Sequence, residues 1–232
     1  MNVAELENMY RHCEEIGDDF TEHSKFIKLL LSENTREMTD YHYELLRRRK
    51  VPILYHRIRA AFRKRKDAES YLIDKLPQEH DPTMQADILQ ILGGLRSSHA
   101  APLAREFVKH NDERHREVGL FVLGWVGDKG DIDILRTHML TETAPLLRIT
   151  AASAHRQIAS RHPELKCDIL RSLKSGFEKE TNDEVLSWII VMIGTIAIKN
   201  LGLREDKEDP HILHGDVQKA KKKAAAFLST LP

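Results

Sequence analysis

REVGLFVLGWVG, residues Arg116 to Gly127, is the stretch that decides the fold, because three other segments align with it over twelve residues without a gap. They are QADILQILGGLR from Gln85 to Arg96, RITAASAHRQIA from Arg148 to Ala159 and LSWIIVMIGTIA from Leu186 to Ala197. In each segment the fourth, seventh, eighth and eleventh positions are mostly apolar, which is the spacing of one helix face. A helix that recurs in this way predicts an α-solenoid, whose units bury their apolar faces on their neighbours.

The ninth position of the repeat is occupied by Gly93, Gly124, Arg156 and Gly194, at steps of 31, 32 and 38 residues. Glycine inside a helix costs roughly 1 kcal/mol relative to alanine, so its recurrence predicts a close approach between helices at this position. Arg156 breaks the pattern.

A polar turn and a second amphipathic helix follow each of the first three segments. The two-helix unit of about 31 residues, with Val122 to Gly127 (VLGWVG) near the end of its first helix, resembles the HEAT family. The resemblance implies an all-α fold, a right-handed α-solenoid of about four HEAT-like two-helix repeats. It also implies a protein-binding scaffold rather than an enzyme, with the second helices lining the concave surface.

The domain organisation expected from the sequence is a single structural domain in three parts. Residues 1–80 form several helices that do not match the repeat, and we interpret them as a divergent helical N-terminal cap. Residues 81–203 contain the HEAT-like repeats. Residues 204–232 comprise a charged, mobile loop that starts with REDKEDP and a C-terminal capping helix.

Composition indicates a cytoplasmic protein. The 232 residues are 41% hydrophobic, which is enough to bury a sizeable core. The first ten residues lack the basic and apolar regions of a secretory signal, and the longest apolar run, Trp188 to Ile198, is too short to cross a bilayer. Cys13 and Cys167 stand alone, without disulfide or ligand spacing.

Charge is balanced overall, with 36 basic and 36 acidic residues, but it is unevenly placed. Residues 1–35 hold eight acids and three bases, whereas residues 36–66 hold eleven bases and three acids. Within the basic stretch, Arg59, Arg63 and Lys66 fall on one helical face as a basic stripe. This stripe is a solvated outer face, a partner for the acidic first helices, or a site for phosphate or an acidic protein.

No metal site or cofactor is predicted. Thirteen histidines are present, but HEXXH is absent, and the only close pair noticed at ligand spacing is His211 with His214. Two other histidines, His138 and His155, occupy positions that are apolar in sister repeats. We expect them to form a buried polar pair, either structural or sensitive to pH or ligand.

Candidate partner-binding residues follow from the expected concave surface. The second helices would carry a row of basic side chains, in which Arg105 and Arg136 are one repeat length of 31 residues apart. Trp125 stands at a position expected to be exposed, as an interface anchor does, unless the next repeat covers it. A row of basic side chains suits an acidic protein surface or a nucleic-acid backbone, unless neighbouring acids neutralise it. The whole set is Arg105, Lys109, Trp125, Arg136, Arg171 and Lys174.

Three classes of function remain from the sequence. The favoured class is a non-enzymatic protein-binding module: an adaptor, a regulator or an immunity-type inhibitor that docks a partner on its concave face. The second is a nucleic-acid-binding protein similar to the HEAT-like alkylpurine DNA glycosylases, although Trp125 and Trp188 lack the expected nearby catalytic aspartate at a motif position. The third is a chromophore lyase similar to the HEAT-like phycobilin lyases, for which no motif is present. The sequence leaves the partner and the oligomeric state open.

Overall fold

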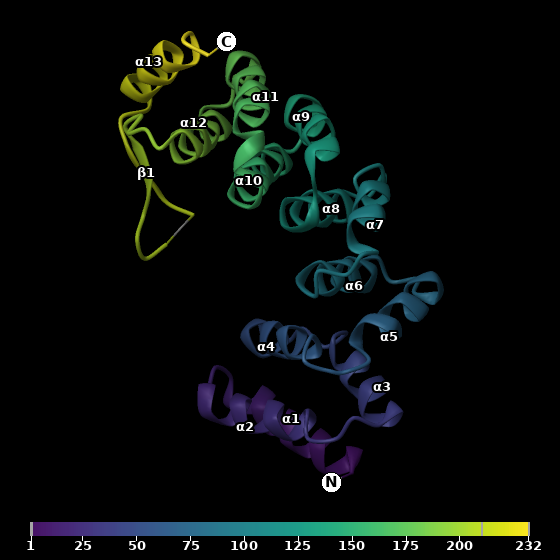
Figure 1. Cartoon of the computed structure of the whole chain (residues 1–232). Coiled ribbons are helices and arrows are strands. Elements are labelled where there is room, and N and C mark those ends of the chain that lie inside the picture. The colour runs from purple at the N-terminus through teal and green to yellow at the C-terminus, as the bar shows by residue number, and fades with distance from the viewer. Residues whose placement is uncertain (1, 210, 232) are drawn as a thin grey trace. The chain divides into compact units, whose positions relative to one another are not determined.

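The computed structural model describes residues 2–209 and 211–231, and these residues form an almost wholly helical fold (Figure 1). Helices account for 72% of it, and the only sheet in the described part has two short strands. The predicted all-α fold class is therefore confirmed. The chain divides into two compact units, Met1–His99 and Ala100–Pro232.

The first unit is built from short helices with polar residues at their starts. Asn2 and Glu5 form a reciprocal capping box at the first helix, and Asp19, Thr35 and Asp81 cap three others through their side-chain oxygens. In chain order the elements are α1 (Val3–Ile16), α2 (Phe20–Leu30), α3 (Arg36–Leu45), α4 (Pro52–Phe62), α5 (Ala68–Lys75), the 3₁₀ helix η1 (Leu76–Gln78) and α6 (Pro82–Gly94).

The core of the first unit lies around α4. This helix packs against α2, α3 and α6, and its residues Leu54, Ile58 and Phe62 are buried. Apolar side chains spaced three or four residues apart therefore place the core on one side of α4, as its periodicity predicts.

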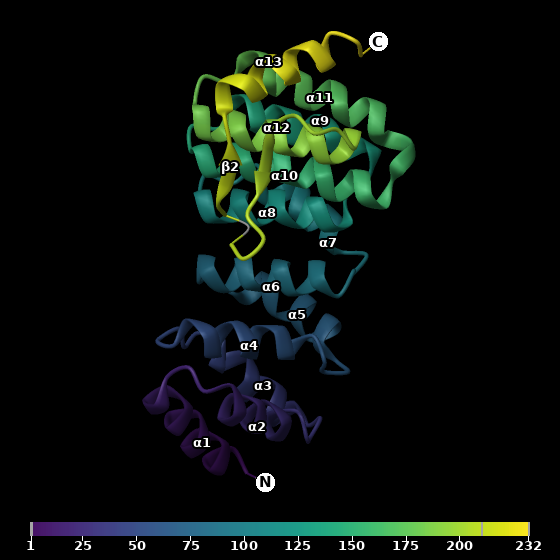
Figure 2. The ribbon, with the colours of Figure 1, turned by 90° about the vertical axis from the view of Figure 1, so that its left-hand side faces the viewer.

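The second unit consists of two helical layers. In chain order its elements are α7 (Ala100–Phe107), α8 (Glu113–Val126), η2 (Lys129–Asp131), α9 (Ile132–Thr141), α10 (Pro145–Arg161), η3 (Pro163–Leu165), α11 (Lys166–Lys179), α12 (Asp183–Ala197), β1 (Leu203–Glu205), β2 (Leu213–Gly215) and α13 (Val217–Leu228). Helix α10 packs between α8 and α12 in one layer, and α9 packs on α11 in the other (Figure 2). Helix α13 packs on α12.

The close approach predicted from the recurring glycine is confirmed at Gly124 in α8. A β-carbon added there would lie 3.1 Å from the Cα of Ala154 in α10 and would also collide with the Gln157 side chain. At Gly194 the close neighbour is the Lys199 carbonyl oxygen, 2.9 Å away, where the chain leaves α12. The two glycines therefore serve different contacts, one between helices and one at a helix end.

A β-hairpin occupies the region predicted as a mobile loop. Leu203, Arg204 and Glu205 pair antiparallel with Gly215, His214 and Leu213. The strands are three residues long, too short for an alternating apolar pattern that sequence could reveal. Arg156, the exception to the glycine rule, donates from Nη1 to Glu205 Oε1 at 2.6 Å and so ties the hairpin to α10.

Within the described residues, no helix is both long and apolar enough to cross a membrane.

Candidate functional site

A groove with a volume of about 430 Å³ lies in the second unit, in the layer formed by α8, α10 and α12. A volume of this size falls in the range of about 300–1,000 Å³ that is typical of ligand sites. The groove is lined from α8 by Glu117 and Phe121, from α10 by Leu146, Ile149, Thr150, Ser153, Ala154, Arg156 and Gln157, from α12 by Glu184 and Trp188, and from the hairpin region by Glu205 and His211.

The floor of the groove follows one face of α10. Leu146, Ile149 and Ser153 are spaced three and four residues apart, so they lie along one side of the helix. Leu146 is 55% exposed, which is unusual for a large aliphatic side chain beside other apolar groups. The floor therefore offers accessible apolar side chains at Leu146 and Ile149, with the small hydroxyl of Ser153 about one turn further along the helix.

The two flanking helices contribute the same pair of residue types. Helix α8 supplies Glu117 with Phe121, and α12 supplies Glu184 with Trp188, in each case four residues apart. Residues at this spacing project from one helix face. Each wall thus combines an aromatic ring with a carboxylate.

The charge of the groove is predominantly negative. Glu205 is paired with Arg156, and Glu117 accepts a hydrogen bond from Arg114 at 2.7 Å. Glu184 lies in the first turn of α12, where the helix dipole favours an acid, and among the described residues its carboxylate has no ion-pair partner. In the part of the chain that the structure describes, three carboxylates therefore line the groove beside a single guanidinium.

The cations expected to contact a partner lie elsewhere, on α7, α9 and α11 or at their ends. Arg105 donates from Nε to Asp131 Oδ1 at 2.7 Å and pairs with Asp128, so it joins the start of α9 to α7. Asp131 is fully buried, and Arg105 is therefore a structural residue rather than a free surface cation.

The remaining members of this cation set are also mostly paired. Lys109 pairs with Glu106, Arg136 with Asp133 and Arg171 with Asp168, each three residues apart on one helix or at its end. A second hollow of about 290 Å³ brings Arg136 and Arg171 together beside Lys129. Lys174 is half-buried on α11.

The tryptophan predicted as an anchor, Trp125, is half-buried and stacks at a tilt on Phe121, with ring centroids 4.5 Å apart. It therefore supports a groove residue but is not among the residues that line the groove. Phe121 and Trp188 line the groove instead; the sequence pointed to Trp188 only for the alkylpurine-glycosylase alternative and did not point to Phe121. Their glutamates four residues earlier are the signal that could have identified them.

The basic stripe of the first unit is not a continuous free surface. Arg59 is only 18% exposed and pairs with the fully buried Asp87 of α6, which Arg49 also contacts. Arg63 lies against Gly94, where a β-carbon would meet its side chain. Lys66 is exposed.

Other bases of the same stretch do contact the acidic first helices. Arg48 binds Glu7 of α1 at 2.8 Å, and Arg57 lies 3.4 Å from Asp18 in the turn before α2. The contact with the acidic helices that was expected of the basic stripe is therefore made by Arg48 and Arg57, which belong to the same basic stretch but not to the stripe.

The predicted histidine pair does not form. A carbonyl oxygen only accepts, so His155 donates from Nδ1 to the Ala151 oxygen at 2.8 Å, and its Nε2 accepts from the Ser172 hydroxyl at 2.7 Å. His138 binds Glu142 through Nδ1 instead. The pairing was wrong because both ring nitrogens of His155 already have partners; the burial of His155 lowers its pKa to about 4.

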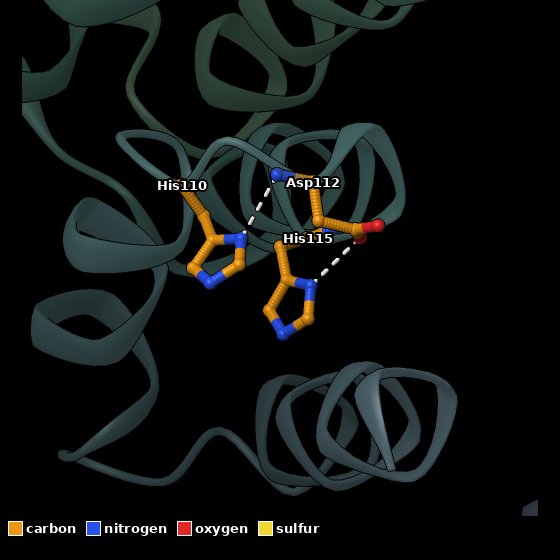
Figure 3. Close-up of side chains that lie close together, drawn as sticks. All are labelled: His110, Asp112 and His115. Atoms are coloured by element: carbon orange, nitrogen blue, oxygen red, sulfur yellow. Dashed lines mark hydrogen bonds and ion pairs between the residues drawn. The ribbon is translucent and has the colours of Figure 1, made fainter. Parts of the chain in front are cut away.

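Among residues 2–209 and 211–231, the side chains that come closest to a metal-ligand cluster are His110, Asp112 and His115 at the start of α8 (Figure 3). His110 accepts the Asp112 N–H at 3.0 Å, and Asp112 accepts from the His115 N–H at 3.0 Å while its Oδ1 faces His115 Nδ1 at 2.8 Å. The two hydrogen bonds from His115, first from its ring and then from its backbone N–H, lower the pKa of the Asp112 carboxyl. His211 and His214, the pair noted from sequence, do not belong to this cluster, and His214 binds Asp206.

Ring geometry indicates that this cluster is a helix start rather than a metal centre. The two imidazoles are stacked, with centroids 4.1 Å apart and planes 21° apart. A metal ion lies in the plane of each imidazole that binds it, and two stacked rings cannot both aim their lone pairs at one point. Two other helix starts have the same turn, in which a side chain accepts the backbone N–H of the residue two positions later. Glu79 accepts the N–H of Asp81 and Glu180 that of Asn182, as His110 accepts that of Asp112. His110 therefore replaces a glutamate in a recurring turn.

Comparison with known proteins gives one family match and one negative result. Residues 69–156 match the family model of HEAT repeats, and no curated protein matches the chain. HEAT repeats commonly mediate protein–protein interaction, and the family is typically non-enzymatic.

The match also corrects the order of helices within the repeat. It begins in α5 and ends in α10, so the units pair α5 with α6, α7 with α8 and α9 with α10. The packing agrees, because α7 contacts α8, and α9 contacts α10, more extensively than α10 contacts α11. The twelve-residue segments are thus second helices, and the predicted cations belong to the first-helix layer. Residues 69–156 of this chain therefore belong to the HEAT-repeat family.

Proposed function

We propose that this chain is a protein-binding module that docks its partner in the groove formed by α8, α10, α12 and the hairpin. The observation that supports it is the combination of an exposed apolar floor with two aromatic and acidic walls. Interface centres are enriched in aromatic residues, and accessible apolar strips rimmed by charge are typical of docking sites. Second helices are also the contact layer that the HEAT resemblance implies.

Catalysis is not required for this role. An adaptor, a regulator and an immunity-type inhibitor all act by occupying a surface, and the groove suits any of them. We expect the partner to meet an acidic rim, so the acidic partner inferred from the cations of the first-helix layer is the less favoured choice.

Nucleic-acid binding, the alternative drawn from the sequence, has less support. Affinity for a phosphate backbone depends on cations that can release counterions. Arg59 and Arg105 are each held by a fully buried aspartate, Asp87 and Asp131. Arg136 and Arg171 are paired with exposed aspartates three residues away on the same helix. The groove itself is lined mainly by glutamates among its charged residues and contains no aspartate beside Trp188.

The test is affinity purification of the tagged full chain from its source, with mass spectrometry of co-purifying proteins, in three versions. We expect one dominant partner with wild type, its loss with Leu146→Asp and its retention with Ile198→Asp. Ile198 is a matched control because it is an exposed aliphatic residue outside the groove, in a left-handed conformation that aspartate tolerates.

A fourth version, Arg136→Glu with Arg171→Glu, tests the first-helix layer. Loss of the partner in this variant with retention in Leu146→Asp would place the interface on the cations and contradict the groove. Nuclease-sensitive co-purification with nucleic acid would favour the alternative function.

A further inference from the structure

The walls of the groove indicate the chemistry of its partner. Each wall presents a glutamate one helical turn from an aromatic ring, at Glu117 with Phe121 and at Glu184 with Trp188. The floor between them is apolar at Leu146 and Ile149. A segment that fits must therefore be apolar along its centre and positively charged on both flanks.

The dimensions of the floor favour a helical segment. The lining residues of α10 run from Leu146 to Gln157, which is about three turns or roughly 16 Å of helix. An amphipathic helix of the same length places apolar residues at intervals of three and four along one face, matching the spacing of the floor. Lysine or arginine residues beside that face would reach the glutamates on both walls.

The carboxylates are able to accept such cations. Glu184 is exposed and has no ion-pair partner among the described residues, and Glu117 is paired only with the exposed Arg114 three residues earlier on α8. Exposed pairs of this kind contribute little to stability, so Glu117 can exchange its partner at small cost. Among the described residues that line the groove, Arg156 is the one arginine or lysine, and Glu205 neutralises it.

We infer that the groove binds a basic amphipathic helix of a partner protein, with its apolar face on α10 and its cations on Glu117 and Glu184. This inference rests on the proposed function and adds the charge and form of the bound segment. Electrostatic complementarity of this kind determines specificity and association rate more than total affinity.

The experiment uses the full chain and two synthetic 16-residue peptides, measured by fluorescence anisotropy. One peptide is an amphipathic helix with leucine on one face and lysine on its flanks, and the other has glutamate in place of lysine. We expect the lysine peptide to bind at least about tenfold more tightly, with the difference shrinking as salt rises because the contacts are solvent-exposed.

Charge reversal provides the decisive variant. Glu117→Lys with Glu184→Lys should invert the preference, so that the glutamate peptide binds more tightly. Glu106→Lys with Glu178→Lys is the matched control, because it changes the net charge equally at exposed sites on α7 and α11, away from the groove. Helical circular dichroism of both variants verifies folding.

The outcomes separate this inference from the proposed function. If the two peptides bind equally or not at all, or if the control inverts the preference as well, the groove does not select a basic helix. If the natural partner is lost with Leu146→Asp but unaffected by the Glu117 and Glu184 reversal, the docking function stands and its charge rule is wrong. If Leu146→Asp affects neither peptide nor partner, the proposed function itself fails.

Discussion

At the scale of single residues, Arg105 has one role predicted from the sequence and another in the structure. Its spacing from Arg136 suggests a repeating surface cation, yet its guanidinium binds the fully buried carboxylate of Asp131. Asp131 also accepts the Asp128 N–H at 2.8 Å, so the pair fixes the turn before α9. The spacing in the sequence identified the cation but could not show which acidic residue it binds.

We predict that Arg105→Ala lowers the free energy of unfolding by about 2 kcal/mol, because it leaves a buried carboxylate without its counter-charge. The measurement is urea unfolding followed by circular dichroism. Lys109→Ala is the control, since Lys109 and Glu106 are both exposed and should contribute less than about 0.5 kcal/mol. Equal stabilities of the two variants would contradict the structural role of Arg105.

His155 supports a prediction about pH. Burial lowers its pKa from 6.5 to about 4, so the unfolded chain binds more protons than the folded protein between these values. Stability should therefore rise with pH across this window, and acidification from pH 7 to pH 5 should cost about 2 kcal/mol from this residue. His42, whose pKa burial lowers to about 3, acts in the same direction.

The measurement compares urea midpoints at pH 7 and pH 5 for wild type and for His155→Leu with Ser172→Ala. Replacing both hydrogen-bonding partners by apolar groups avoids leaving a buried hydroxyl unpaired. Between pH 7 and pH 5 the double variant should lose less free energy of unfolding than wild type does. It should still lose some, because His42 contributes in both proteins. An identical pH dependence in the two proteins would show that His155 is not held neutral by burial.

At the scale of elements, the recurring helices could be predicted from sequence and their order could not. The apolar spacing of the twelve-residue segments fixes a helix and the repeat length, and the structure has helices at all four places. Spacing alone does not show whether a helix is the first or the second helix of a two-helix unit. The residues predicted to contact a partner therefore lie on α7, α9 and α11, which are first helices, and not in the layer of second helices.

The hairpin and the groove were missed for a related reason. Strands of three residues are too short to show a recognisable alternation of apolar and polar residues. In the sequence, Arg156 was only an exception to the recurring glycine, and the structure shows that it binds Glu205 of the hairpin. The aromatic residues of the groove come from separate repeats and from different positions within the twelve-residue segment. Only the packing of α8 and α12 on α10 brings them together.

Gly124 allows a direct test of helix packing between α8 and α10. Gly124→Leu should destabilise the protein by about 1–3 kcal/mol, because even a β-carbon would meet the backbone at Ala154 and the side chain of Gln157. The measurement is the change in melting temperature. Gly130→Leu is a useful contrast, since Gly130 lies in an exposed turn whose nearest obstacle is the Asp128 side chain at 3.2 Å. A larger loss at Gly130 than at Gly124 would contradict the close approach.

At the scale of the whole molecule, stability in a repeat protein is a sum of local terms, because each element packs mainly on its neighbours in sequence. In the second unit α10 contacts α8, α9, α11 and α12, whereas α13 packs on α12. Elements with few partners open at lower free energy than those held on several sides. Opening should therefore become easier from α10 towards α13.

We predict that backbone amides of α13 exchange with solvent at least about tenfold faster than those of α10, measured by native-state hydrogen exchange with mass spectrometry. Leu228→Ala, which truncates a buried side chain of α13, should speed exchange within α13 while leaving α8 and α10 unchanged. The physical reason is that nearest-neighbour coupling transmits a local loss only weakly beyond the adjoining element. If α10 and α13 instead exchange together, and Leu228→Ala accelerates both equally, residues 100–232 unfold as one cooperative block and the additive description is wrong.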